Sequence, residues 1–191
     1  IAIARAAGFE PVIRLAGGHA AVFLESALAF AWATPDANAN LHIRERFETL
    51  TRWFVCALRE LGLDARVGEV PGEYCPGEYS INLAGRFKVM GVGQRVIRGA
   101  AHVGGVLTIE QTETLREILV PIYDALDLEF APDTAGGIAD LEPGLTAADV
   151  ISALRTVLVA EDYSLQDETF DSTIQDEAGA FVSHHEAEST S

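Results

Sequence analysis

The sequence predicts an α+β domain, with a mostly antiparallel β-sheet flanked by helices. Three observations lead to this fold class. Short apolar segments bounded by glycine or polar residues are concentrated in the first two thirds of the chain, as in strands. Only a few segments repeat apolar residues every three or four positions, as helices do. The strand candidates at residues 79–109 follow one another through short turns, which join antiparallel strands.

The first third of the chain contains three strand candidates between two helices. Residues 1–7 look like the end of a helix that stops at Gly8. An amphipathic helix is predicted from about residue 41 to Leu61, because its apolar side chains are three or four apart, and Gly62 caps it. The strand candidates between the two helices are 11–14, 20–23 and 27–32.

The middle of the chain predicts a meander of strands, and two helices follow it. A helix over 112–126 is expected to bend or break at Pro121, and Thr146 with Asp149 forms a capping box for a helix that ends near residue 160. The meander consists of a brief strand at 64–67, a loop rich in glycine and proline at 68–77, alternating apolar residues at 79–83, a strand around Lys88 and a strand at 103–109.

Length and charge indicate one domain and an acidic tail. About half of the 191 residues are apolar, enough for one domain with a core over residues 1–160. Residues 161–191 contain nine of the 29 acidic residues and no Lys or Arg, and we expect this tail to be disordered. No basic stripe suggests nucleic-acid binding, and no apolar run is long enough to span a membrane.

The two cysteines favour a reduced, cytoplasmic protein. They are too few for a disulfide framework. Cys56 lies in the predicted amphipathic helix beside its apolar side, so we expect an inert, packed thiol. The tail pair His184-His185 has no accompanying ligands at zinc spacing, so no metal site is predicted.

Lys88 is the only lysine among thirteen basic residues, and it lies in a strand with apolar residues on both faces. A lysine buried there costs free energy unless it is paired or takes part in function. Downstream, Gly91 and Gly93 on alternate positions would leave a shallow channel wide enough for an alkyl chain.

Two further segments have the composition of a ligand site. In the first, Gly17 and Gly18 let backbone N–H groups approach a ligand, and Arg14 supplies a cation for a phosphate or carboxylate. In the second, Cys75 stands in the loop 68–77, where a thiol can be exposed rather than packed. A glycine pair between strands is also a common ordinary turn, so the first signal alone is weak.

Taken in order, these segments resemble the biotin/lipoate A/B protein ligase family, which includes lipoate-protein ligases and octanoyltransferases. The resemblance covers residues 1–109, and more loosely the helix that ends near residue 160. It is closest to the lipoate ligase and amidotransferase-like members, since no biotin-type Gly-Arg-Gly-x-x-Gly loop is present. The motifs are Arg14-x-x-Gly17-Gly18, Tyr74-Cys75-Pro76-Gly77, Gly85-Arg86-x-Lys88-x-x-Gly91 and His102-x-Gly104.

The resemblance implies a fold of the biotin/lipoate ligase catalytic-domain type and roles for individual residues. Lys88 would contact the acyl carbonyl or, in ligases, the adenylate phosphate. Cys75 would form a thioester with the acyl group in the amidotransferase branch. The substrate-binding residues would be Arg14, Gly17, Gly18, His19, Gly91 and His102. His19 replaces a third glycine of the family, so it either touches the acyl head group or is an ordinary loop histidine. The alignment of His102 is approximate.

The implied activity is attachment of a lipoyl or octanoyl group to a lysine of a lipoyl carrier domain, of the 2-oxoacid dehydrogenase or glycine cleavage H protein type. A ligase would use ATP and Mg²⁺ and pass through lipoyl-AMP. A transferase would need no cofactor and would take the group from acyl carrier protein or another carrier through Cys75. The family label slightly favours the ligase. Family domains carry a further N-terminal segment, which we expect this chain to lack, and this leaves a non-catalytic acyl-binding or regulatory domain as an alternative.

Overall fold

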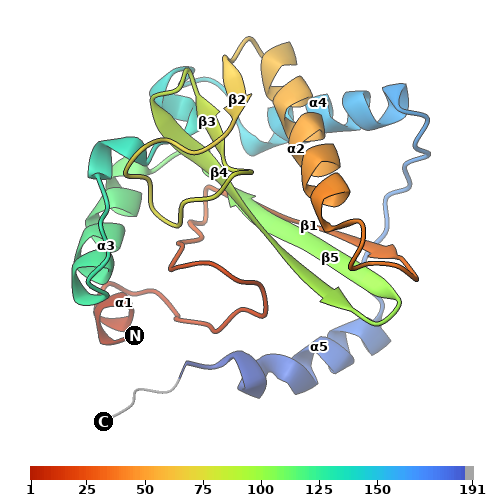
Figure 1. Cartoon of the computed structure of the whole chain (residues 1–191), viewed down its shortest axis with the longest axis horizontal. Coiled ribbons are helices and arrows are strands. Elements are labelled where there is room, and N and C mark those ends of the chain that lie inside the picture. Colours follow the sequence, from red (N-terminus) through yellow and green to blue (C-terminus); the bar gives the residue numbers. More distant parts are fainter. Residues whose placement is uncertain (188–191) are drawn as a thin grey trace.

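One antiparallel sheet organises residues 1–187, the part of the chain that the computed structural model describes. In this part five strands lie in the order β1-β5-β4-β3-β2. The long β4–β5 hairpin crosses the molecule, and β3 and β2 continue the sheet on one side (Figure 1). The strands are β1 (Leu28–Pro35), β2 (Ala65–Val67), β3 (Ile81–Leu83), β4 (Phe87–Ile97) and β5 (Ala100–Leu107).

Helices divide the interior into two hydrophobic clusters. In the larger cluster α2 and α4 pack against each other and against the sheet. The smaller cluster surrounds α3, where Val22, Leu24 and Tyr74 join its buried side chains. Figure 1 shows α3 and α1 at the opposite end of the molecule from α4. The helices are α1 (Ala2–Ala6), α2 (Ile43–Glu60), α3 (Thr112–Ala125), α4 (Ala147–Ala160) and α5 (Ser172–His185), with short 3₁₀ turns at Pro132–Thr134 and Ile138–Asp140.

The structure confirms the predicted fold class and most predicted elements. The amphipathic helix is α2, and Gly62 after it adopts a positive φ of 83°. The capping box of Thr146 and Asp149 opens α4. The helix is not broken at Pro121, because α3 continues through it from Thr112 to Ala125.

Two of the predicted strands are wrong. The segment 11–14 makes only a single bridge, between Val12 and Glu186, and 20–23 belongs to no strand. Val22 and Leu24 are buried while Phe23 is exposed, so the segment alternates as a strand would. The buried side chains pack in the α3 cluster, and none of the strands within residues 1–187 pairs with this segment.

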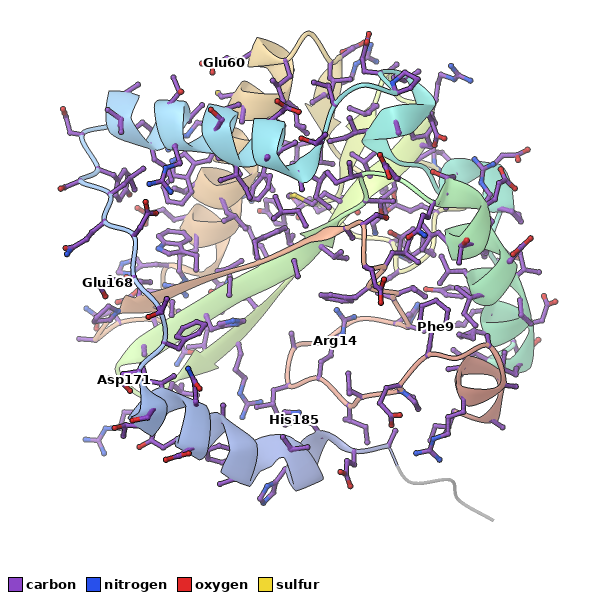
Figure 2. All side chains as sticks on the ribbon, turned by 180° about the vertical axis from the view of Figure 1, so that it is seen from behind. Phe9, Arg14, Glu60, Glu168, Asp171 and His185 are labelled. Carbon is purple, nitrogen blue, oxygen red and sulfur yellow. The ribbon has the colours of Figure 1, made fainter. Side chains whose placement is uncertain are left out.

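The acidic tail and Cys56 also differ from expectation. Asp171 accepts a hydrogen bond from the Ile174 N–H and opens α5, so disorder does not describe residues 172–185. This helix lies beside the segment before Arg14, and the Ile13 N–H donates to the His185 carbonyl at 2.8 Å (Figure 2). The tail's last four residues, 188–191, lie outside the described part. Cys56 faces solvent because the helix turns its neighbours, not Cys56, toward the core.

Glycine allows the β4–β5 hairpin to pack closely. A Cβ at Gly105 would meet the Gly91 carbonyl oxygen and would lie 2.9 Å from the Phe30 ring. The lack of a side chain at Gly105 therefore allows β5 to pack closely against Gly91 and Phe30. Among the described residues, no helix has the length and apolar character needed to cross a bilayer.

We predict that Gly105→Ala lowers the free energy of unfolding by about 2 kcal/mol, because the added methyl group overpacks the hairpin. Urea unfolding followed by tryptophan fluorescence measures the change. Gly144→Ala is the matched control, since a Cβ there meets nothing within 4 Å. Equal stabilities for the two variants would contradict this account of the hairpin.

Candidate active site

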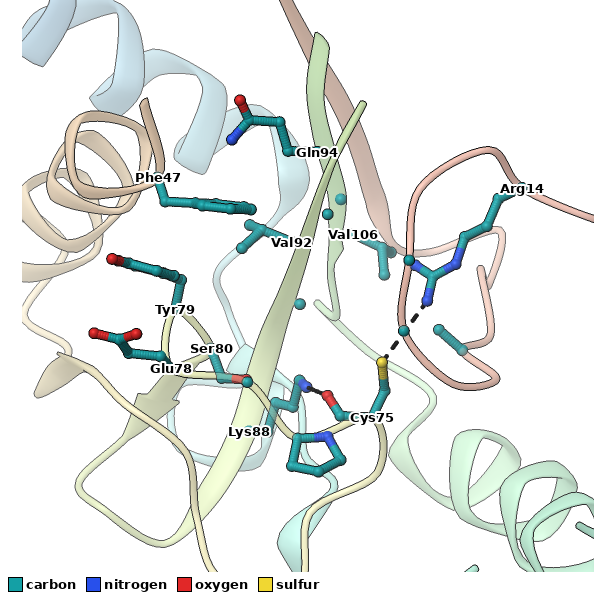
Figure 3. Close-up of a pocket in the computed structure, with 18 of the residues that line it drawn as sticks. Arg14, Phe47, Cys75, Glu78, Tyr79, Ser80, Lys88, Val92, Gln94 and Val106 are labelled. Carbon is teal, nitrogen blue, oxygen red and sulfur yellow. Dashed lines mark hydrogen bonds between the residues drawn. The ribbon is translucent and has the colours of Figure 1, made fainter. Parts of the chain in front are cut away.

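A cavity of about 360 Å³ opens where β3 ends and β4 continues alone on that side. β3 pairs with β4 only as far as Met90, so the following residues of β4 border the cavity. Its walls come from the loop 14–23, the first turns of α2, the loop 74–80 and the β4–β5 hairpin. Figure 3 shows these segments converging on Cys75 and Lys88.

Cys75 stands at the meeting point of two loops. Its φ of 42° lies in the left-handed region, which is uncommon for a residue other than glycine and is often found at functional sites. The half-buried Sγ accepts hydrogen bonds from the His19 N–H at 3.2 Å and from Arg14 Nη2 at 3.7 Å. A backbone donor and a guanidinium therefore face the sulfur, an arrangement that stabilises negative charge on it.

Lys88 is 1 % exposed and uses all three of its N–H donors within the protein. Its Nζ lies 2.7 Å from the Cys75 carbonyl oxygen, 3.0 Å from that of Tyr74 and 3.0 Å from Glu73 Oε1. The ammonium also lies 4.8 Å from the centre of the Tyr74 ring. The buried lysine is thus paired, and it holds the backbone that carries the candidate nucleophile.

Glu73 supplies the negative charge that balances Lys88. Its side chain is fully buried, and besides Lys88 it accepts hydrogen bonds from Ser80 Oγ at 2.5 Å and the Val70 N–H at 2.8 Å. Burial and the Glu73 charge hold the pKa of the adjacent Tyr74 well above its usual range, so this phenol stays neutral.

The far part of the cavity is apolar. The rings of Phe47 and Tyr79 stack 4.8 Å apart with Val92 beside them, while Val106 lines the cavity on the side of the Arg14 loop (Figure 3). Gly91 and Gly93 also line the cavity, but a Cβ at Gly91 would lie 3.3 Å from Lys88 Cε and one at Gly93 would lie 3.0 Å from the Ala16 Cβ, so neither glycine faces an empty channel. An alkyl chain attached near Cys75 would meet mainly hydrocarbon here.

The structure brings together most of the residues predicted from the sequence. Arg14, Gly17, Gly18, Cys75, Lys88 and Gly91 all line the cavity. His19 contributes its backbone N–H to the sulfur, while its exposed side chain is not part of the lining.

His102 does not line the cavity. It is exposed on β5 and pairs with Arg95, one step of the two-residue strand repeat beyond the Gly93–Gly104 pair. It occupies the same face of β5 as Gly104, but it lies two residues nearer to the turn of the hairpin, beyond the cavity. We correct the sequence-based assignment accordingly.

Sequence reasoning missed two residues of the site, Glu73 and Tyr123. The Tyr123 hydroxyl accepts a hydrogen bond from the Cys75 N–H at 2.6 Å. A buried lysine requires an anion, so the acids of the loop 68–77 were a usable signal for Glu73. Tyr123 carries no such signal, because it reads as one more apolar position of a helix.

Comparison with known proteins finds one family whose catalytic domain matches most of the chain. The lipoyl protein ligase A/B catalytic domain matches residues 1–158. Two similar proteins are octanoyl-GcvH:protein N-octanoyltransferases. That of Bacillus velezensis is 30% identical over 159 residues, which are 83% of this chain and 55% of the relative. That of an Exiguobacterium species is 31% identical over 162 residues, 79% of this chain and 57% of the relative. The chain spans about half the length of these relatives.

Among solved structures, a lipoate-protein ligase A bound with ATP superposes with a TM-score of 0.73 at 20% identity. The alignment covers 93% of this chain and 69% of that one. At this identity the likeness shows the fold, which agrees with the catalytic-domain type implied by the motifs.

We predict that Glu73→Gln destabilises the protein by about 3 kcal/mol, because it leaves the Lys88 ammonium buried without a countercharge. Urea unfolding measures the loss. Glu78→Gln, which removes an exposed carboxylate from the same loop, serves as the control and should change stability little. The double variant Glu73→Gln/Lys88→Met should lose less stability than the sum of the losses of the two single variants, because neither charge remains buried without its partner. A loss for Glu73→Gln as small as that of the control would contradict the buried ion pair.

Proposed function

The chain belongs to the lipoyl protein ligase A/B catalytic domain family, and on this premise we propose that it is an enzyme that transfers an octanoyl or lipoyl group to a lysine of a carrier protein through a thioester on Cys75. One observation carries the proposal: the Cys75 sulfur lies at an apolar cavity and accepts hydrogen bonds from a guanidinium and a backbone N–H. The names of the similar octanoyltransferases support the reaction class.

The proposed reaction has two acyl-transfer steps. In the first, the Cys75 thiol gives up its proton and its sulfur attacks the acyl carbonyl on a donor carrier; the C–S bond of the thioester forms, the bond from the acyl carbon to the donor nitrogen or sulfur breaks, and that leaving atom takes the proton. In the second, the neutral amine of the acceptor lysine attacks the thioester, the amide C–N bond forms, the C–S bond breaks, and the proton lost by the amine returns to the Cys75 sulfur. Arg14 and the His19 N–H stabilise the sulfur whenever it carries negative charge.

The cavity suits the acyl tail of such a substrate. With the carbonyl at Cys75, the alkyl chain would lie against the apolar part of the lining, formed by Val92, Phe47 and Tyr79. Lys88 has a supporting role in this proposal, since its three donors already bind Glu73 and the backbone of the Cys75 turn. It fixes the turn and places positive charge near the reacting carbonyl.

The adenylating route is the second candidate, and the similar fold of an ATP-bound ligase favours it. Its magnesium would need a set of oxygen ligands. Within residues 1–187, no group of three or more His, Cys, Asp or Glu side chains is placed to hold a metal ion. Because magnesium is commonly held by one or two carboxylates together with substrate phosphates and water, this finding neither selects nor excludes the ligase, and the ATP requirement tested below distinguishes the two routes.

The proposed partners are carriers of the lipoyl type. The acceptor would be the lipoyl domain of a 2-oxoacid dehydrogenase, and the donor would be a glycine cleavage H-type protein or acyl carrier protein. The free thiols of Cys56 and Cys75 suit a reducing compartment, so we propose a cytoplasmic location.

The first test replaces the nucleophile. Octanoyl-loaded H-type carrier and an unmodified lipoyl domain are incubated with the full chain, and the lipoyl domain is weighed by mass spectrometry. We expect it to gain an octanoyl group without ATP, and Cys75→Ser to abolish the gain. Cys56→Ser, at the other free cysteine, should transfer as well as the natural chain.

Three other results would redirect the assignment. Transfer that needs lipoate, ATP and Mg²⁺ and survives Cys75→Ser selects the ligase. Transfer only from octanoyl acyl carrier protein changes the donor but keeps the thioester. A chain that binds octanoate yet modifies no carrier under any of these conditions would be the non-catalytic acyl-binding domain.

A second test concerns Arg14. We expect Arg14→Gln to slow thioester formation on Cys75 about tenfold, because it removes one charged donor to the sulfur. Quenched-flow mass spectrometry of the intact protein follows the thioester. Arg98→Gln removes an exposed arginine away from the cavity and should leave the rate unchanged. Equal rates for Arg14→Gln and the natural chain would remove Arg14 from the mechanism.

A further inference from the structure

Tyr123 of α3 connects two backbone segments that meet at the Cys75 sulfur. Its hydroxyl oxygen accepts a hydrogen bond from the Cys75 N–H at 2.6 Å and donates to the Ala20 carbonyl at 2.9 Å. The directions are unambiguous, since a backbone N–H can only donate and a carbonyl can only accept. Burial raises the pKa of this phenol to about 12, so the proton that binds Ala20 is retained at neutral pH.

Apart from Tyr123, the hydrogen bonds described between the two segments all end on the Cys75 sulfur itself. Ala20 follows His19 directly, and Arg14 donates to the His19 carbonyl at 2.8 Å, so the Ala20 carbonyl belongs to the loop that carries both donors to the sulfur. Cys75 lies on a loop more than fifty residues later in the chain. One oxygen atom of Tyr123 therefore fixes the position of the nucleophile's backbone relative to the donors that face its sulfur.

The fit between the two segments is close. A Cβ at Gly18 would lie 2.9 Å from Sγ and 2.7 Å from Arg14 Nη2, so the loop packs against the thiol without room for a side chain. Cys75 itself is held in the left-handed region, with a φ of 42°. Its N–H is bound by Tyr123 and its carbonyl by Lys88, which together restrain that conformation from both sides.

The Tyr123 ring is anchored away from the cavity. The residue is 1 % exposed in the α3 cluster, and its ring centre lies 5.3 Å from that of Phe130. It is not part of the cavity lining, so it would not touch a bound acyl group. Its influence on the reaction must pass through the two backbone groups it binds.

We propose that Tyr123 is a positioning residue for acyl transfer, which holds Cys75 against the His19 N–H and Arg14. This inference rests on the proposed role of Cys75 as the acyl acceptor. It assigns to α3 a function beyond packing, namely to carry the hydroxyl that joins the two halves of the thiol site.

Tyr123→Phe in the full chain tests the inference, because it keeps the ring and removes only the hydroxyl. We expect kcat for octanoyl transfer between carriers to fall about tenfold while KM for the octanoyl carrier stays unchanged, since the acyl cavity is intact. Alkylation of Cys75 by iodoacetamide, followed by peptide mass mapping at pH 7, should also slow about tenfold, because the donors no longer face the sulfur.

Two variants separate positioning from general destabilisation. Tyr163→Phe removes a phenol hydroxyl beside Trp53, away from the cavity, and should change neither rate. Val150→Ala, in the larger core cluster, should lower the urea midpoint while leaving Cys75 alkylation of the folded protein unchanged.

The outcomes are distinct for the two proposals. The positioning role is overturned if Tyr123→Phe transfers octanoyl groups and is alkylated at Cys75 as fast as the unsubstituted chain. It is also overturned if KM rises while kcat stays unchanged. If Val150→Ala slows alkylation as much as Tyr123→Phe does, stability alone explains the effect and the inference also fails. If the natural chain transfers no octanoyl group, the proposed function fails, while the alkylation comparison still decides whether Tyr123 positions the thiol.

Discussion

The site depends on the burial of one ammonium group. Lys88 is almost fully removed from water, and its three donors end on Glu73 and on the carbonyls of Tyr74 and Cys75. Burying such a charge is costly unless every donor is satisfied and a countercharge is present. The loop 68–77 therefore folds over the lysine, and the turn of Cys75 takes the position that completes this coordination.

The sheet and the two core clusters determine the position and orientation of the Cys75 turn. Lys88 comes from β4, just before β3 ends and the strand continues beside the cavity. The loop that covers the lysine then reaches the α3 cluster through Tyr74, and Tyr123 binds the backbone of Cys75 from that side. The thiol thus lies between the two clusters, with α2 supplying the apolar wall and the α3 side supplying polar restraint.

Local sequence patterns predicted much of the fold and several residues of the site, but not the contacts between distant segments. The periodicity of α2, the capping box of α4 and the unusual Lys88 are all visible in the sequence, because each rests on residues close together in the chain. The prediction of a strand at 20–23 was wrong because alternating apolar residues indicate a buried face, but they do not show whether a strand or a helix packs against it. Tyr123 and Ala20 are 103 residues apart, and no local pattern indicates that their polar groups meet. His102 was wrongly assigned to the site because the motif indicates which face of the strand the residue occupies, but not how far along the strand it lies from the cavity.

A thioester mechanism would also explain why the sulfur is only half exposed at an apolar cavity. Transfer of an acyl group from one lysine to another exchanges one amide for another, so no net activation by a nucleotide is required. The thioester between the two amides is the high-energy species, and water that reached it would waste the acyl group. In this mechanism Phe47, Val92 and Val106 would shield the tail from water, while Arg14 and the His19 N–H would favour the charged sulfur as it leaves. The same few residues would then protect the intermediate and lower the barriers on either side of it.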